Sequence, residues 1–139
     1  MKYSIIIPAY NEESRIGDTV RDYAAYIEQH FTPGEAELWI IVNGSRDRTE
    51  EIAKELAKSL PNVRSWETPE RQGKGGAVLK GFELASGEIV AFADADNATV
   101  ASELHKLLNA VENGADAAIG SRWLPGSFQA VPQPLARRI

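Results

Sequence analysis

The sequence predicts an α/β fold in which a parallel sheet is covered by helices on both faces. Short apolar runs alternate with amphipathic helical patterns along its 139 residues, and this alternation is typical of consecutive strand–helix–strand units. The length suits a single domain that can bury a substantial core. Hydrophobic residues make up 43% and charged residues 25% of the chain, the composition of a globular protein rather than of a disordered chain or a coiled coil.

The expected strands are short apolar runs rich in β-branched and aromatic residues. Each is bounded by Gly, Pro, Asn or Asp, as buried strands commonly are. In chain order they are Tyr3–Ile7, Leu38–Val42, a weaker candidate at Asn62–Trp66, Ile89–Phe92 and Ala115–Ile119.

Four helices are expected between these strands, because apolar residues recur there every three or four positions. Glycines close the last two of them. The apolar stripes are Ile16–Ile27 in a helix near residues 12–30, Ile52–Leu60, Val78–Phe82 closed by Gly87, and Leu104–Val111 closed by Gly114.

The charge balance and the residue types present exclude several functional classes. The chain has 15 Lys+Arg against 20 Asp+Glu, a net charge of −5, which argues against a nucleic-acid partner. Without cysteine there are no disulfides, zinc–thiolate sites or cysteine nucleophiles. No apolar run reaches the roughly 20 residues of a membrane span. Pro8 and Asn11 also interrupt the N-terminal run too early for a signal peptide, so we expect a cytoplasmic protein.

Residues 121–139 differ from the rest of the chain in charge. They contain Arg122, Arg137 and Arg138 and no acidic residue, and the stretch 123–134 has three prolines without a periodic apolar face. We expect residues 123–139 to form a loop and a basic C-terminal segment. Such a segment suits contact with a phosphate or with the anionic cytoplasmic face of a membrane; a solvated arm is the alternative.

Polar residues follow directly after the expected strands. Because ligands of parallel α/β sheets gather at the carboxyl ends of the strands, we expect a binding site at that edge. The segments that would build it are Pro8–Glu12, Asn43–Asp47, Asp94–Asn97 and Gly120–Arg122.

Asp94 and Asp96 are the strongest candidates for chemistry. Residues two apart on an extended backbone point to the same side, so both carboxylates converge beyond the strand end. Hard divalent cations such as Mg²⁺ or Mn²⁺ use such oxygen ligands and leave positions open for substrate phosphates. The alternative is that Asp94 caps the following turn and Asp96 is solvated, but their position after a strand favours the metal site.

Two other motifs that contain paired aspartates do not fit the spacing of Asp94–Thr99. A calcium-binding EF-hand loop counted from Asp94 would need a ligand and a glycine where Ala98 and Thr99 stand. A phosphatase of the haloacid dehalogenase type, with Asp94 as nucleophile, would need its threonine one residue earlier than Thr99. A hydrolase or phosphatase is therefore the weaker hypothesis.

The glycine-rich turn Gly73–Gly76 opens the third expected helix. Glycines permit close backbone approach, and the free amides of a helix start favour anions, with Lys74 adding a positive charge. Thr68 and Gly75 occupy positions where a P-loop needs other residues, and Val78 breaks a dinucleotide fingerprint. A tightly packed helix start is the alternative to an anion site.

Taken together, five blocks of the sequence resemble a family 2 glycosyltransferase with the GT-A fold, nearest to the dolichyl-phosphate glucosyltransferase branch. They are Ile5–Glu13, Asn43–Thr49, Gly73–Ala77, Ala93–Thr99 and Gly120–Arg122. The resemblance implies a Rossmann-like, three-layer α/β/α nucleotide-diphospho-sugar transferase fold. Residues 1–122 would be its nucleotide-sugar-binding subdomain and residues 123–139 the start of an acceptor region.

The resemblance also implies a role for each matching residue. The implied reaction is metal-dependent, inverting transfer of a hexose from a nucleotide sugar such as UDP-glucose to a polyprenyl or dolichyl phosphate, with Mg²⁺ or Mn²⁺ as cofactor. Asp94 would lie near the ribose and the metal, and Asp96 would hold the metal on the diphosphate. The nucleotide pocket would be lined by Pro8, Ala9, Tyr10, Glu12, Asn43, Gly73 and Lys74, and the acceptor phosphate faced by Arg122, Arg137 and Arg138.

Two departures from the family pattern shape these expectations. Val42 stands where the family often has an aspartate, and valine cannot accept a hydrogen bond from a base, so slack recognition of uracil is expected. The chain also ends where the family's acceptor half would begin. The alternative function is therefore a nucleotide-sugar-binding module that is inactive alone and is completed by a homodimer or a partner chain.

Overall fold

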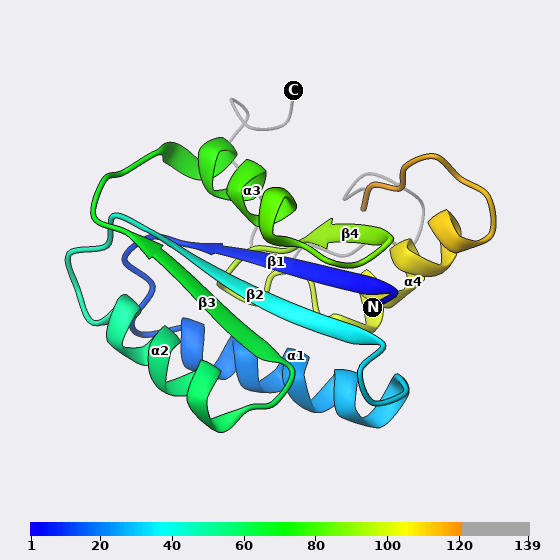
Figure 1. Cartoon of the computed structure of the whole chain (residues 1–139), viewed down its shortest axis with the longest axis horizontal. Helices are drawn as coiled ribbons and strands as arrows, with labels where there is room; N and C mark the ends of the chain where they lie inside the picture. The colour runs from blue at the N-terminus through cyan, green and yellow to red at the C-terminus, as the bar shows by residue number, and fades with distance from the viewer. Residues whose placement is uncertain (121–139) are drawn as a thin grey trace.

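The computed structural model describes residues 1–120 and contains one parallel sheet with helices on both faces (Figure 1). Arg122, Arg137, Arg138 and the segment 123–139 lie outside the described residues. The strands are β1 (Tyr3–Ala9), β2 (Ala36–Asn43), β3 (Val63–Thr68) and β4 (Ile89–Phe92). The helices are α1 (Ile16–His30), α2 (Thr49–Ser59), α3 (Gly73–Leu84) and α4 (Ala101–Glu112).

The strand order β3-β2-β1-β4 places the first strand inside the sheet. β1 pairs in parallel with β2 on one side and with β4 on the other. Helices α1 and α2 cover one face, α3 packs on β1 and β2 from the other, and α4 contacts β4 and α1. The predicted three-layer α/β/α arrangement is therefore confirmed. None of the helices in residues 1–120 has the length and apolar character needed to cross a membrane.

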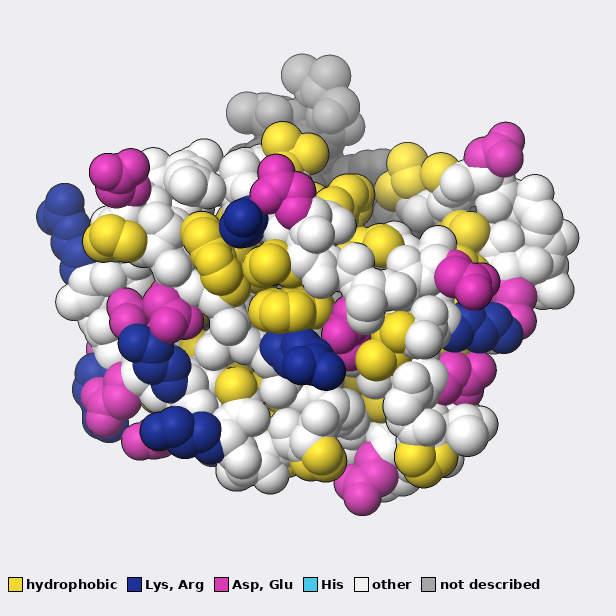
Figure 2. Space-filling model, viewed as in Figure 1, with side chains coloured by type: hydrophobic (Ala, Val, Ile, Leu, Met, Phe, Trp, Pro, Cys, Tyr) yellow, Lys and Arg dark blue, Asp and Glu magenta, His cyan; other side chains and the backbone are white. Residues whose placement is uncertain are grey.

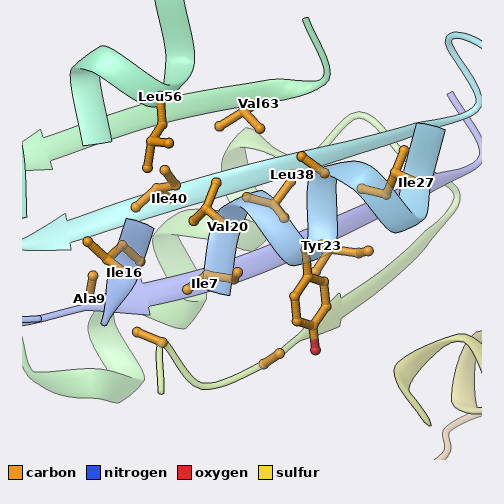
Figure 3. Close-up of a cluster of buried hydrophobic side chains, with 14 of the residues drawn as sticks. Ile7, Ala9, Ile16, Val20, Tyr23, Ile27, Leu38, Ile40, Leu56 and Val63 are labelled. Carbon is orange, nitrogen blue, oxygen red and sulfur yellow. The ribbon is translucent and has the colours of Figure 1, made fainter. Parts of the chain in front are cut away.

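The core lies mainly between the sheet and α1. The expected stripe of α1 is confirmed, since Ile16, Val20, Tyr23 and Ile27 are all buried against strand residues such as Leu38 (Figure 3). Burying an aliphatic side chain of this size contributes roughly 1.5–3 kcal/mol. This face of the sheet therefore holds most of the hydrophobic stabilisation.

The opposite face of the sheet is covered differently from the expectation. The residues of α3 that face the sheet are Ala77 and Gly81, whereas the predicted contact residue Phe82 is 44% exposed. A Cβ at Gly81 would lie 2.2 Å from Cγ2 of Ile6, so only glycine lets the helix approach β1 this closely. Leu79 and Phe82 of α3 are left at the surface, while Leu84 packs against the cluster of Ile6 and Ile41. Figure 2 shows hydrophobic side chains gathered on this side of the molecule.

The first helix begins later than the pattern from residue 12 predicts. The backbone N–H groups of Glu12 and Glu13 donate to Thr49 Oγ1 at 2.8 Å and to Asp47 Oδ2 at 3.2 Å. Both acceptors lie more than 30 residues away, at the start of α2 and two residues before it. Residues 13–15 form a turn, and α1 starts at Ile16, later than the pattern predicts.

The prediction of a strand at Ala115–Ile119 is wrong. Within residues 1–120 this segment forms no ladder with β4, and Ile119 is 87% exposed. A strand needs a hydrogen-bonding partner as well as apolar residues. The weaker candidate at Asn62–Trp66 is confirmed as β3, because β2 offers it a full parallel ladder.

A buried carboxylate ties the strand starts to the connection between α3 and β4. Glu37 is 3% exposed; its Oε1 accepts hydrogen bonds from Ser4 Oγ at 2.7 Å and from the Ser86 N–H at 2.9 Å, while Arg64 Nε donates to Oε2 at 3.1 Å. Burial opposes ionisation, but the hydrogen bonds from Ser4 and Ser86 outweigh it, and the pKa of Glu37 lies below its ordinary value. The ionised carboxylate is thus the form that this network stabilises.

We predict that Glu37→Gln lowers the free energy of unfolding by about 2 kcal/mol, the range for hydrogen bonds to charged groups. Glutamine keeps one acceptor but places an NH₂ group against the Arg64 guanidinium. Since the folded pKa is lowered, the wild-type advantage is present above the ordinary carboxyl pKa of 4.5 and is lost as the pH falls through the folded value. Urea titrations at several pH values measure this, with the exposed Glu88→Gln as control; equal losses in both variants would contradict it.

Candidate functional site

A cavity of about 520 Å³ opens at the carboxyl ends of the strands. It brings together every residue predicted for the nucleotide and metal sites except Gly73, whose turn lies beside it. Its lining consists of Pro8, Ala9, Tyr10, Glu12, Asn43, Arg71, Lys74, Asp94, Ala95 and Asp96. A more apolar cavity of about 560 Å³, lined by residues such as Phe31, Ala36 and Leu60, contains none of these residues.

The loops after β1 and β2 are joined by hydrogen bonds between their motif residues. The Asn11 N–H donates to Ser45 Oγ at 3.0 Å, and the Arg46 N–H donates to Asn11 Oδ1 at 2.9 Å. Asn11 adopts a left-handed backbone (φ 51°), which asparagine tolerates better than most residues. Asn11 and Ser45 therefore connect the two loops, while Tyr10 and Glu12, on either side of Asn11, line the cavity.

Asn43 positions the glycine-rich turn. Its side chain is buried, and its amide donates from Nδ2 to the Gly73 carbonyl at 2.8 Å and accepts the Gln72 N–H at 2.6 Å. Gly44 follows with φ 66°, and a Cβ at this position would lie 2.7 Å from the backbone nitrogen of Arg71. The end of β2 therefore fixes the start of α3 through an amide clamp and a close backbone approach.

Arg71 is the site residue that the sequence reasoning missed. Its guanidinium carbon lies 4.2 Å from the centroid of the Tyr10 ring, within the range of a cation–π contact, and both side chains line the cavity. The signal available in the sequence was its place two residues before the glycine-rich turn. An arginine in a turn is ordinarily a solvated residue, so this position alone did not identify it.

The two carboxylates have different surroundings. Asp94 is half-exposed and forms an ion pair with Lys74 across the cavity. Asp96 is exposed, and its Oδ1 accepts the Ala98 N–H at 3.0 Å. The residue that caps the turn is thus Asp96 rather than Asp94. One oxygen of Asp96 and the second oxygen of Asp94 have no hydrogen bond within residues 1–120.

The donor set fits a divalent cation that completes its shell with ligand oxygens. The described residues contain no cluster of three or more His, Cys, Asp or Glu able to hold a metal ion. Mg²⁺ and Mn²⁺ are commonly bound by one or two carboxylates together with substrate phosphates and water. Asp94 and Asp96, on the wall of one cavity, supply that number of carboxylates.

Val42 is buried at the end of β2. Its side chain is 1% exposed and packs in the core on the α1 face of the sheet. Because side chains alternate along a strand, it is the following residue, Asn43, that reaches the cavity. The slack recognition of uracil expected from Val42 stays a prediction.

A parallel sheet with a polar cavity at the carboxyl ends of its strands is typical of α/β proteins that bind their ligands at that edge. The chain belongs to glycosyl transferase family 2, whose family model matches residues 4–131. It is 39% identical to the glycosyltransferase AglD of Haloferax volcanii, over 90% of this chain and 20% of that protein. It is 38% identical to a dolichyl-phosphate beta-glucosyltransferase of Drosophila melanogaster, over 88% of this chain and 41% of that protein.

Solved glycosyltransferase structures agree with the GT-A fold expected from the sequence. S. aureus TarS in complex with UDP matches 81% of this chain and 32% of its own, with a TM-score of 0.66 and 26% identity. The mannosyltransferase PcManGT from Pyrobaculum calidifontis, in complex with GDP-Man and Mn²⁺, matches 68% of this chain and 27% of its own, with a TM-score of 0.61 and 29% identity. The chain thus spans less than half the length of these curated relatives and solved structures.

We predict that Val42→Asp destabilises the fold by about 3 kcal/mol or more. The introduced carboxylate would be buried in the core with no partner, which is among the costlier single substitutions. Chemical denaturation measures the loss, and Leu79→Asp on the exposed face of α3 is the control, expected to change stability by about 0.5 kcal/mol. A Val42→Asp protein as stable as the Leu79→Asp control would contradict the buried position.

Proposed function

We propose that this chain binds the nucleotide-sugar donor of a hexosyltransferase, with Mg²⁺ or Mn²⁺, and that the hexose is passed with inversion to a lipid phosphate. The observation that carries the proposal is the meeting of Asp94, Asp96 and Lys74 with the end of β1 in one cavity. A nucleoside diphosphate needs an apolar wall for the base, cations for the phosphates and carboxylates for the metal, and each is present there.

The named relatives support a nucleotide-sugar donor. The solved neighbours bind UDP, UDP-GlcNAc and, with Mn²⁺, GDP-Man. Curated relatives include dolichyl-phosphate glucosyltransferases and a dolichol-phosphate mannosyltransferase. We favour UDP-glucose as donor and a polyprenyl or dolichyl phosphate as acceptor, because the glycine-rich block and the threonine after the carboxylate pair resemble the glucosyl branch more than the mannosyl branch.

Each cavity residue has a task in this proposal. Tyr10 and Arg71 form a wall against which a base can stack. Lys74 neutralises Asp94, and its ammonium is free to turn to the diphosphate once another cation takes over that carboxylate. Bound between the carboxylates and the diphosphate, a divalent ion would act as the Lewis acid that stabilises the leaving nucleotide.

The acceptor side of the proposal rests on residues outside the described part of the chain. We assign Arg122, Arg137 and Arg138 to the acceptor phosphate because a guanidinium fork grips phosphate oxygens bidentately. A phosphate acceptor needs little general base, since its second pKa is near 6. Residues 1–122 are accordingly the donor subdomain and 123–139 the start of the acceptor region. A donor-binding module without turnover of its own is the alternative, in keeping with the greater length of the relatives.

We predict that UDP binds more tightly in the presence of Mn²⁺ and that Asp96→Ala removes most of this gain. The expected loss is about tenfold or more in affinity, or about 1.4 kcal/mol, because one of two metal carboxylates is gone. Isothermal titration with UDP, with and without Mn²⁺, measures it. Asp116→Ala, which removes an exposed carboxylate elsewhere, should keep the full gain, and equal UDP affinity in both conditions for the wild type would refute the metal site.

We predict that the chain binds vesicles containing polyprenyl phosphate more strongly than vesicles containing polyprenol. The double variant Arg137→Gln/Arg138→Gln should lose this difference, because only the phosphate-binding guanidinium groups are removed. Co-sedimentation measures binding, and Arg21→Gln on the exposed surface of α1 is the control. Adding radiolabelled UDP-glucose distinguishes transfer from donor binding alone by the label found in the lipid. Indifference of the wild type to the lipid phosphate would contradict the assigned acceptor.

A further inference from the structure

Side chains on one face of α1 form hydrogen bonds with the loop after β4, which carries Asp94 and Asp96. Three α1 residues spaced for that face, Thr19, Asp22 and Tyr23, contact the segment 95–99. Thr19 Oγ1 donates to the Ala95 carbonyl at 2.6 Å, Asn97 Nδ2 donates to Asp22 Oδ2 at 2.9 Å, and the Tyr23 hydroxyl donates to the Thr99 carbonyl.

Two of these contacts are made from inside the core. Thr19 is 1% exposed and Tyr23 is fully buried. The Thr19 hydroxyl has a second acceptor, the Arg15 carbonyl at 3.1 Å. The Tyr23 hydroxyl has no other partner within residues 1–120, so loss of the Thr99 carbonyl would leave it unsatisfied. Figure 3 shows the Tyr23 ring passing along the aliphatic cluster, with its oxygen pointing away from the labelled aliphatic side chains. Burial, together with the nearby Asp94 carboxylate, raises the pKa of Tyr23, so the hydroxyl keeps the proton that it donates.

The loop is otherwise held at its start and by local contacts: the Ala93 N–H donates to the Ile6 carbonyl at 2.9 Å, Lys74 pairs with Asp94, and Asp96 accepts the Ala98 N–H. Residues 93–99 lie in neither helix nor strand, and Asn97 has a left-handed backbone (φ 60°). Ala93 and Ala95 are buried, while Asp94 and Asp96 alternate with them and line the cavity. The alternation that aims both carboxylates at the cavity therefore depends on keeping the carbonyls of Ala95 and Thr99 in place.

We propose that Thr19, Asp22 and Tyr23 are positioning residues that hold the Asp94–Thr99 loop in the conformation that receives the cation before any ligand arrives. This inference rests on the proposed function, since the cation is the one that Asp94 and Asp96 would hold. Groups that orient metal ligands influence metal affinity without contacting the metal. A site that already has its binding conformation loses less conformational entropy when the ligand binds. The three α1 side chains occupy that position here.

The test compares substitutions that remove one oxygen from α1. Tyr23→Phe and Thr19→Val each delete a hydrogen bond to the loop and keep the side-chain shape. Tyr26→Phe is the matched control, because Tyr26 lies on the same helix and its hydroxyl bonds His105 Nδ1 at 2.8 Å rather than the loop. Thr19→Ser, which keeps the hydroxyl, is the conservative rescue.

Two measurements separate positioning from general stability. Titration with UDP, with and without Mn²⁺, should show the Mn²⁺-dependent gain reduced five- to tenfold in Tyr23→Phe and in Thr19→Val. The metal-free UDP affinity should change less than twofold, and Tyr26→Phe and Thr19→Ser should keep the wild-type gain. Amide hydrogen exchange without metal should become faster in residues 95–99 of the first two variants and stay unchanged there in Tyr26→Phe.

The outcomes distinguish this inference from the function on which it rests. A wild-type chain whose UDP affinity ignores Mn²⁺ overturns both the proposed function and the positioning role. A wild-type Mn²⁺ gain that persists in Thr19→Val and Tyr23→Phe overturns the positioning role alone, as does an equal loss in Tyr26→Phe. If Tyr23→Phe does not fold, the comparison of Thr19→Val with Thr19→Ser decides the matter by the same criteria.

Discussion

The parallel pairing of β1 with both of its neighbours is the constraint on which the site depends. β1 is buried on both faces through Ile5, Ile6 and Ile7, and it sets the register of β2 on one side and β4 on the other. Because the three strands run in the same direction, their carboxyl ends meet at one edge. The residues after β1, β2 and β4 thereby come together, although the ends of β1 (Ala9) and β4 (Phe92) are more than 80 residues apart in sequence.

The two helical layers contribute differently to that edge. On one face α1 packs with long aliphatic and aromatic side chains and reaches the loop after β4 through Thr19 and Tyr23. On the other face α3 approaches through Ala77 and Gly81, and its start is fixed by Asn43. The loop after β4 is therefore held by core residues of α1, and the turn at the start of α3 is held by the end of β2.

The carboxylates of the cavity are partly compensated by cationic side chains before any ligand is present. Lys74 neutralises Asp94, and Arg71 lies over the Tyr10 ring, so cationic groups stand beside both the carboxylate pair and the aromatic wall. Two carboxylates on one wall repel each other unless a cationic group lies beside them. A site that has both a mobile ammonium and two acidic groups suits a ligand that brings its own negative charge and a divalent cation.

The sequence by itself determined the fold class, the apolar face of α1, the strands β1, β2 and β4, and the carboxylate pair with its glycine-rich turn. These follow from local periodicity and short-range spacing, which tertiary contacts rarely reverse when the pattern is long. The tertiary structure alone decided that α1 starts at Ile16, that Ala115–Ile119 forms no strand, that Val42 faces the core and that α1 clamps the loop at Ala95 and Thr99. The physical reason is that each of these outcomes depends on a hydrogen-bond partner or a packing neighbour distant in sequence, and no local pattern specifies which distant group will be there.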